Sequence, residues 1–238
     1  MTPHPDNFRP LLKAFLERGY AFSAFAGAPE GRTVMLRHDI DFSLESALEA
    51  ATVEHELGIA ATYFFMLSSN FYNLWSPHAR AMVERVAALG HTISLHYDPT
   101  AHESVEAGFE LERDAFERLF STRIETVSLH RPRGFLEDND RPLPGVGHTY
   151  ETRWFKAIQY ASDSAGSFRY GHPLETEAVR EGRPLHLLLH PIWWTRQGDT
   201  PSDKIRDWQR RNHAFLLEEA ALNCGSFDRV SFHEVALP

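Results

Sequence analysis

Apolar and polar residues follow one another in blocks, and the blocks predict strands and helices in regular alternation. Short apolar runs bounded by turn residues are typical of buried strands, whereas apolar positions that recur every three to four residues indicate helices covering a core. The strands are predicted at residues 33–36, 59–67, 91–95, 125–129, 157–161 and 185–189. The helices are predicted at residues 6–19, 43–57, 76–89, 103–120 and 202–222. Strands that alternate with helices indicate a parallel sheet, either open or closed as a barrel.

Turn and cap residues mark where these elements begin and end. Ser43 is a predicted N-cap, and Gly58 ends the helix that follows it. Pro77 takes the first position of the next helix. Residues 136–150 are rich in proline and glycine and read as a long loop, and a last short strand is expected near residues 229–232.

The composition is that of an ordinary globular protein, with 42% hydrophobic and 24% charged residues in a chain of 238. No internal repeat, low-complexity segment or linker interrupts the chain, so we expect one domain over residues 1–238. A formal net charge of -9, without a cluster of Lys and Arg, argues against nucleic-acid binding. The 14 histidines permit a metal site.

Cys224 is the single cysteine, which excludes an intrachain disulfide and a thiolate metal site. The first ten residues lack the apolar stretch and the small-residue cleavage site of a secretory signal. No run approaches the roughly 18 apolar residues of a membrane span. We therefore expect a cytoplasmic protein without a membrane span.

Unusual polar residues gather just after the predicted strands. They are Asp39 and Asp41, His96, His130 and Arg131, Asp163, and His190. Parallel α/β folds build their sites at the carboxyl ends of the strands. Five separate segments are therefore expected to meet on one face of the sheet.

Asp39 and Asp41 carry the clearest chemical signal. Two carboxylates two residues apart in an extended chain face the same side, and at the end of a buried strand both are costly unless paired or metal-bound. The pair suits a general base and an oxygen ligand, and the alternative is a surface turn with an aspartate N-cap.

His96 alone is typical of a core or loop histidine. Together with the Asp pair it indicates a set of two histidines and one carboxylate for zinc or iron.

The remaining strand ends allow more than one interpretation. Three interpretations of Arg131 are open. It pairs with Asp163 and orients a base, it binds a polar substrate, or it forms a surface salt bridge. His190 follows an apolar run and is either a general acid or a capping histidine. Trp193 and Trp194 form a sugar-stacking wall or belong to the core.

Taken in order, these segments resemble the five motifs of the polysaccharide deacetylase (NodB-homology) carbohydrate esterases, over roughly residues 33–195. The chain looks closest to a bacterial branch with an Arg-His-Asp-x-Asp opening, associated with surface-polysaccharide biosynthesis. The matching segments are Arg37-His38-Asp39-Ile40-Asp41, Gly90-His91-Thr92-Ile93-Ser94-Leu95-His96, Arg131-Pro132-Arg133-Gly134, Asp163-Ser164 and His190. The resemblance implies an α/β fold, a distorted (β/α) barrel with fewer than eight strands, here about seven.

The resemblance also implies a role for each matching residue. It gives Asp39 as the catalytic base, Asp41 and His96 as metal ligands, His190 as the general acid, and Arg131 and Asp163 as the residues that tune Asp39 and His190. The implied cofactor is a divalent metal, Zn²⁺ first, with Fe²⁺, Co²⁺ and Ni²⁺ as alternatives.

One position departs from the family's pattern. The second metal histidine usually stands four residues after the first, and that position here is Thr100. Two replacements are available, His130 at the end of the next strand and His102 in a loop. We predict His130, because strand ends are held more rigidly than loops.

The implied activity is hydrolysis of an N-acetyl or other acyl group from an amino sugar, not of a peptide bond. A metal-bound water attacks, Asp39 takes its proton, and His190 protonates the departing amine. A nucleotide-linked or lipid-linked amino sugar, or a small biosynthetic intermediate, suits a cytoplasmic enzyme better than a cell-wall polymer. Two alternatives stay open: a hydrolase of another small amide or cyclic ureide, and a non-catalytic glycan- or partner-binding domain with a degenerate site.

Overall fold

The computed structural model describes residues 2–25, 27–134, 138, 140–169 and 171–227. The strands are β1 (Ala21–Ser23), β2 (Thr33–Ile40), β3 (Thr62–Phe65), β4 (Thr92–Tyr97), β5 (Thr126–Leu129), β6 (Gly147–His148), β7 (Gln159–Ser162) and β8 (Leu185–Leu189). The α-helices are α1 (Pro5–Glu17), α2 (Leu44–Glu56), α3 (Pro77–Ala88), α4 (Val105–Phe120), α5 (Thr152–Phe155), α6 (Glu177–Glu181), α7 (Ile192–Thr195) and α8 (Pro201–Asn223).

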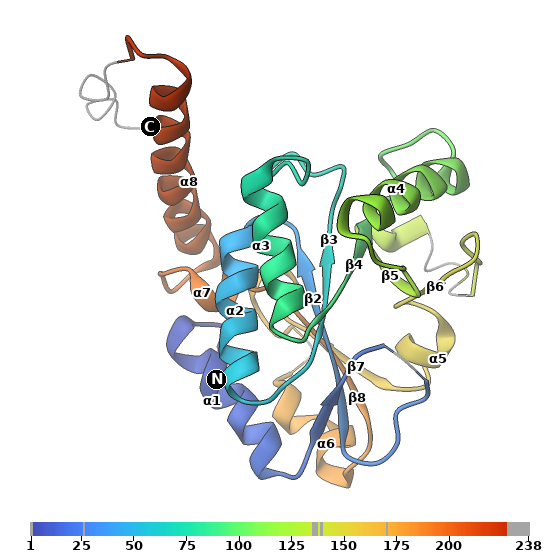
Figure 1. The fold of residues 1–238 in the computed structure, drawn as a ribbon. Coiled ribbons are helices and arrows are strands. Elements are labelled where there is room, and N and C mark those ends of the chain that lie inside the picture. The colour runs from blue at the N-terminus through green and yellow to red at the C-terminus, as the bar shows by residue number, and fades with distance from the viewer. Residues whose placement is uncertain (1, 26, 135–137, 139, 170, 228–238) are drawn as a thin grey trace.

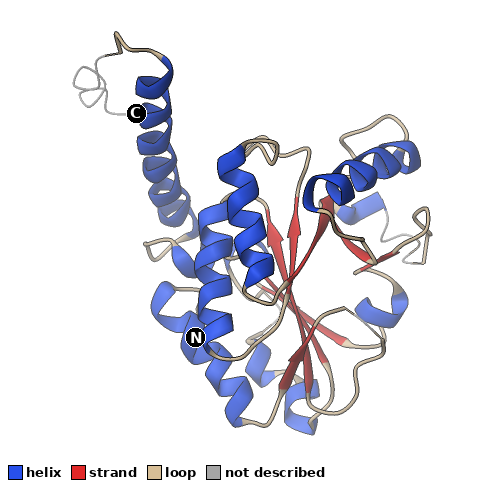
Figure 2. Cartoon of the chain, viewed as in Figure 1, coloured by secondary structure: helices blue, strands red, loops and turns tan. Residues whose placement is uncertain are grey.

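The strands form one parallel sheet in the order β6-β5-β4-β3-β2-β8-β7. The short strand β1 pairs with the first half of β2, and β3 pairs with the second half. Every paired strand runs parallel to its neighbour, and the sheet curls so that the strands cross near the centre of the molecule (Figure 2). This is the predicted distorted (β/α) barrel with seven parallel strands along its path.

Helices α1, α2 and α3 cover the outer face of the sheet beside β2 and β3 (Figure 1). Leu11, Leu12 and Phe15 of α1 are fully buried there. Small residues on α2, Ala47 and Ala50, allow that helix to approach the sheet closely. Burial of this apolar stripe is what fixes the helices on the sheet.

Side chains of β2 alternate between the two faces of the sheet, as the pleat of a strand requires. His38 points to the helices, where its Nε2 lies 2.6 Å from Glu54 Oε1 and its ring stacks on Tyr63. Arg37 and Asp39 point to the opposite, inner face, where they bond to each other. Strand β2 therefore carries the first of the polar groups that meet inside the curled sheet.

Helices α2 and α3 begin where Ser43 and Pro77 indicated, and α4 and α8 begin at cap residues that were not predicted. Ser43, Ser76, Ser104 and Thr200 each accept a hydrogen bond from a backbone N–H in the first turn of α2, α3, α4 and α8. Helix α8 then extends away from the body of the molecule (Figure 1). Among the described residues, no helix is both long enough and apolar enough to cross a bilayer.

Several short elements differ from the prediction. Strand β2 continues to Ile40, so Asp39 lies within the strand rather than after it. The loop expected at residues 136–150 contains the two-residue strand β6. Strand β1 and the short helices α5, α6 and α7 were not predicted. The strand expected near residues 229–232 lies outside the described residues.

Candidate active site

The carboxyl ends of the parallel strands open into a cavity of about 670 Å³. Its lining includes Asp39, Asp41, His96, His130 and His190. These residues come from the ends of β2, β4, β5 and β8, so four of the five segments predicted to meet on one face line this cavity directly. From the fifth segment, at the end of β7, Ser164 lines the cavity and Asp163 lies directly behind His190.

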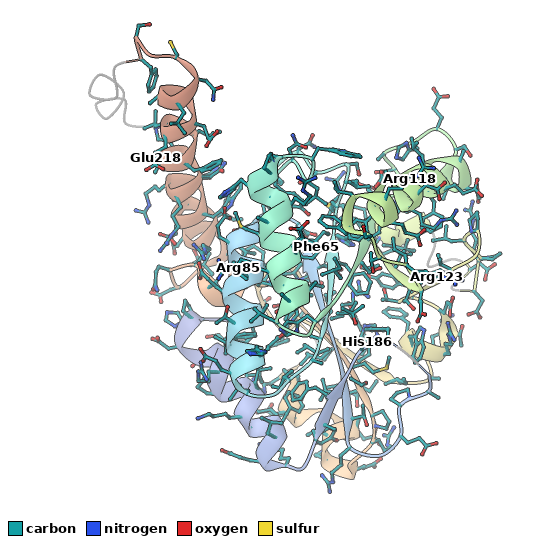
Figure 3. The ribbon with its side chains drawn as sticks, viewed as in Figure 1. Phe65, Arg85, Arg118, Arg123, His186 and Glu218 are labelled. Carbon is teal, nitrogen blue, oxygen red and sulfur yellow. The ribbon has the colours of Figure 1, made fainter. Side chains whose placement is uncertain are left out.

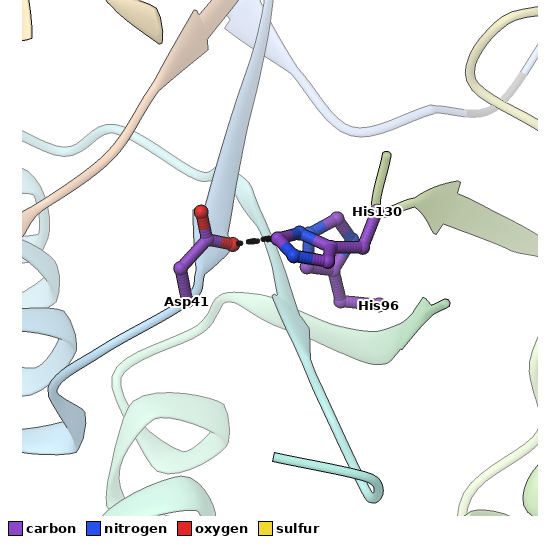
Figure 4. A group of neighbouring side chains, drawn as sticks. All are labelled: Asp41, His96 and His130. Atoms are coloured by element: carbon purple, nitrogen blue, oxygen red, sulfur yellow. Dashed lines mark hydrogen bonds and ion pairs between the residues drawn. The ribbon is translucent and has the colours of Figure 1, made fainter. Parts of the chain in front are cut away.

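Asp41, His96 and His130 point their ligand atoms at one another (Figure 4). Asp41 Oδ1 lies 3.2 Å from His96 Nε2 and 3.5 Å from His130 Nδ1. The two histidine nitrogens lie 3.2 Å apart. Among the described residues this is the group of His, Cys, Asp and Glu side chains arranged to hold a metal ion.

The geometry and the donor chemistry of this group fit a divalent metal. Ligand atoms about 2.0–2.2 Å from a tetrahedral zinc lie roughly 3.3–3.6 Å from one another, close to the observed separations. Asp41 Oδ1 is buried and has no hydrogen-bond partner among the described residues. Burial would raise the pKa of Asp41, but the neighbouring histidines His130 and His96 hold it well below its usual range. The oxygen is therefore a charged ligand atom with room for a cation.

The two other positions considered for the second histidine ligand point elsewhere. The backbone N–H and the hydroxyl of Thr100 donate to Asp98 Oδ1 over 2.9 and 2.6 Å. His102 Nε2 lies 2.7 Å from Glu112 Oε1. In the described part of the chain, His130 rather than His102 lies in the group around Asp41 that could hold a metal ion.

Asp39 lies beside this group and is held by Arg37. Its two oxygens accept hydrogen bonds from Arg37 Nε over 3.0 Å and from Arg37 Nη2 over 2.7 Å. Ser128 Oγ donates to Oδ2 over 3.0 Å, and His96 Nε2 is 3.7 Å from the same oxygen. Burial would raise the pKa of Asp39, but the Arg37 guanidinium holds it well below its usual range.

Arg37 is itself fully buried and was not among the predicted site residues. Besides Asp39, its guanidinium donates to Thr149 Oγ1 over 2.5 Å and to the Tyr150 hydroxyl over 3.1 Å. Thr149 and Tyr150 follow the two-residue strand β6, inside the segment predicted to be a loop. The spacing of Arg37 and Asp39, two residues apart in a strand, was the signal that would have found this pair.

Arg131, in contrast, does not make the ion pair expected from the sequence. Within the described residues its one ion-pair partner is Asp98, at 3.8 Å, rather than Asp163. Its side chain is 68% exposed, and its backbone has a positive φ of 49°. The turn after β5 therefore directs the guanidinium outward along the cavity, and Arg37 takes the place beside Asp39.

His190 is held by Asp163 at the end of β7. Its Nδ1 donates to Asp163 Oδ1 over 2.7 Å, and its backbone N–H donates to the same carboxylate over 3.0 Å. Nε2 faces the cavity, 3.8 Å from Asp41 Oδ2. Burial lowers the pKa of His190, but Asp163 outweighs it and raises the pKa to about 9.

The two tryptophans after His190 belong to the core. Trp194 is 1% exposed, and its indole N–H donates to Asp163 Oδ2 over 2.7 Å. Trp193 is 6% exposed and its ring contacts that of Phe42. Of the two interpretations left open by the sequence, packing rather than an exposed sugar-stacking wall describes these residues.

No family model and no curated protein matches the chain. Solved structures similar to it include a peptidoglycan deacetylase from Bacillus subtilis, at 12% identity and a TM-score of 0.44, covering 79% of this chain and 87% of that one. A chitin deacetylase from Colletotrichum lindemuthianum matches at 13% identity and a TM-score of 0.41, over 75% and 82% of the two chains. A CE4 family pseudoenzyme from Bacillus anthracis matches at 10% identity and a TM-score of 0.39, over 75% and 60%. Carbohydrate deacetylases are thus among the matches.

Proposed function

We propose that this chain is a metal-dependent hydrolase that removes an N-acetyl group from an amino sugar. One observation carries the proposal. The metal-binding group Asp41, His96 and His130 shares a cavity with a carboxylate, Asp39, and an imidazole, His190. Amide hydrolysis needs an electrophilic centre, a base and an acid within reach of one another, and this cavity offers residues for all three.

Asp41, His96 and His130 would hold the metal through one oxygen and two nitrogen atoms. This donor set suits Zn²⁺ best, and it also accepts Fe²⁺, Co²⁺ or Ni²⁺. When bound, such an ion supplies Lewis-acid polarisation of a carbonyl group and acidification of water.

Asp39 is proposed as the group that takes a proton from the attacking water. Because Arg37 lowers its pKa, the carboxylate stays ionised at neutral pH and is ready to accept. The same contact makes Asp39 a weak base, so Asp39 would need the acidification of water that a bound ion supplies. Ser128 and Arg37 fix both carboxylate oxygens, which limits the positions from which water can donate.

His190 is proposed as the acid that protonates the departing amine. A carboxylate only accepts hydrogen bonds, so Asp163 fixes the proton on His190 Nδ1 and leaves Nε2 facing the cavity. With a pKa near 9, the ring is protonated at neutral pH and can give up the Nε2 proton. An amine leaves an amide only when it is protonated, so this step completes the hydrolysis.

Acetate release from a panel of acetamido sugars tests the proposal. We expect turnover by the wild type after incubation with Zn²⁺, and loss of at least about 10²-fold in Asp39→Asn with metal content unchanged. Asp114→Asn, an exposed position on α4, is the matched control and keeps the wild-type rate. If Asp39→Asn keeps that rate, the assignment of the base is wrong. Ammonia release from small amides or cyclic ureides, without acetate release, would replace the proposed substrate class.

A further inference from the structure

Two arginines, Arg131 and Arg169, lie in the lining of the active-site cavity. They come from separate connections, Arg131 from the turn after β5 and Arg169 from the segment after β7. The acidic residues of the same lining are Asp39 and Asp41, and both already face cationic partners or the metal-binding histidines. The carboxylates of the cavity therefore do not neutralise the positive charge of the two arginines.

Neither guanidinium is neutralised by a close ion pair. Arg169 is exposed and has no ion-pair partner among the described residues. The partner of Arg131 is Asp98, at 3.8 Å, which is near the limit for an ion pair, and the Arg131 side chain is 68% exposed. The whole chain has a net charge of -9, so two exposed guanidinium groups at one cavity, one of them with a single long ion pair, give this cavity a local charge of opposite sign.

The backbone adopts a rare conformation at Arg131 and, shortly before Arg169, at Ala165. Positive φ angles occur at three non-glycine residues of the described chain, Ser121, Arg131 and Ala165, and the last two line the cavity. L-residues rarely adopt this conformation, and strain of this kind collects at binding sites. At this turn the Arg131 side chain lies along the wall of the cavity.

The segment that carries Arg169 is anchored on both sides of Ala165. Asp163 is fixed by His190 and Trp194. Gly166 lies so close to Pro201 that an added Cβ would come within 2.6 Å of the proline ring. The Phe168 ring then packs on Trp194, with ring centroids 6.0 Å apart. Arg169 therefore follows a backbone that is tied to α7 and α8, which fixes where its side chain starts.

We infer that the substrate is an amino sugar carrying an anionic group, which Arg131 and Arg169 bind while the acetamido group lies against Asp39 and His190. The inference rests on the proposed function. A guanidinium presents a planar set of donors that matches the oxygens of a phosphate or a carboxylate. The cavity of about 670 Å³ falls within the roughly 300–1,000 Å³ typical of small-molecule sites. A sugar with one anionic substituent is of that class.

Three probes distinguish the source of the charge: N-acetylglucosamine 1-phosphate, N-acetylmuramic acid and neutral N-acetylglucosamine. We expect the wild type to release acetate from a phosphate- or carboxylate-bearing sugar at least about tenfold faster, as kcat/KM, than from the neutral sugar. A higher kcat/KM for the phosphate-bearing or the carboxylate-bearing sugar identifies which anionic group the arginines bind. Equal kcat/KM for all three, or preference for the neutral sugar, overturns the inference.

Variants that remove one positive charge each test whether the two arginines cause the preference for an anionic sugar. Arg169→Gln and Arg131→Gln should each reduce kcat/KM for the preferred anionic sugar about tenfold more than they reduce kcat/KM for the neutral sugar. Arg118→Gln removes an equal charge from α4, away from the cavity, and is the matched control (Figure 3). If neither cavity variant changes the ratio between anionic and neutral sugar, the arginines do not select the substrate.

Calorimetric binding separates this inference from the proposed deacetylation. One outcome is that no sugar is hydrolysed, but N-acetylglucosamine 1-phosphate or N-acetylmuramic acid binds at least about tenfold more tightly than N-acetylglucosamine, and Arg169→Gln removes this difference in affinity. The anion site would then be supported, and the proposed deacetylation would be wrong. If acetate is released but affinity does not depend on the charged group, the function stands and the anion site fails.

Discussion

Arg37 shows how one buried side chain determines what its neighbour can do. Its guanidinium is fully buried and bonds to both oxygens of Asp39, so the carboxylate is charged and fixed in orientation. Removing either partner would leave an uncompensated buried charge, at a cost of about 3–5 kcal/mol. The pair is therefore part of the fold as well as of the site.

Asp163 is expected to act on the reaction through His190. Asp163→Asn removes the carboxylate that raises the pKa of His190, so the ring is expected to be neutral at neutral pH and a poor proton donor from Nε2; kcat should fall about 10²–10⁴-fold. The measurement is steady-state acetate release, with circular dichroism to confirm folding. A change in kcat within about threefold would show that His190 does not depend on Asp163.

His186 predicts a pH dependence of stability that is separate from the active-site group. It is fully buried, donates from Nδ1 to the Trp154 carbonyl over 3.0 Å, and burial lowers its pKa to about 3. Between that value and the unfolded pKa of about 6.5, the unfolded chain binds a proton that the folded chain does not, so stability falls as pH falls.

The variant His186→Asn keeps a donor for the Trp154 carbonyl and removes the titration. From pH 6 to pH 4, the wild type should lose free energy of unfolding relative to His186→Asn, by up to about 1.4 kcal/mol per pH unit. Denaturant unfolding at each pH measures the difference. Parallel pH profiles for the two proteins would mean that the His186 pKa is not lowered by folding.

At the scale of elements, the strands carry Asp39 and His96, and the connections that follow the strands carry other residues of the site. The connection from β7 to α6 carries Asp163, which holds His190, and then Arg169, which faces the cavity. Gly166 lies between them with a φ of 80° and an added Cβ would contact Pro201 of α8. This contact ties the connection to the last helix.

Gly166→Ala should therefore strain the connection in two ways, through the positive φ and through the contact with Pro201. We expect a loss of about 1–3 kcal/mol in the free energy of unfolding, or several degrees in Tm. Gly225→Ala is the control, because an added Cβ there meets no atom within 4 Å, and it should stay within about 0.5 kcal/mol of the wild type. Equal stability of both variants would contradict the close contact.

The long elements were predictable because their signals are local. Apolar periodicity gave the positions of α2, α3, α4 and α8, and Ser43 and Pro77 marked the starts of α2 and α3. Apolar runs gave β3, β4, β5 and β8 to within a few residues. The short elements β1, β6 and α5 have two to four residues each and no period to detect. Tertiary contacts rather than local propensity create them.

At the scale of the whole molecule, the curl of the parallel sheet joins strand ends that are far apart in sequence. Alternation of strands and helices predicted which end of the sheet carries the site, and Asp41, His96 and His130 meet there. Arg37 was missed although its spacing from Asp39 was visible, because arginine is rarely fully buried and its other partners, Thr149 and Tyr150, come from a segment that the sequence presents only as a loop.

Metal content tests the central claim most directly. Elemental analysis of the wild type, His130→Ala and His102→Ala, each purified without chelator and incubated with Zn²⁺, compares the two histidines in the same protein. We expect one metal ion per chain in the wild type and in His102→Ala, and loss of that ion in His130→Ala. A wild type without metal, or a His130→Ala that keeps its metal while His102→Ala loses it, would show that Asp41, His96 and His130 do not form the metal site.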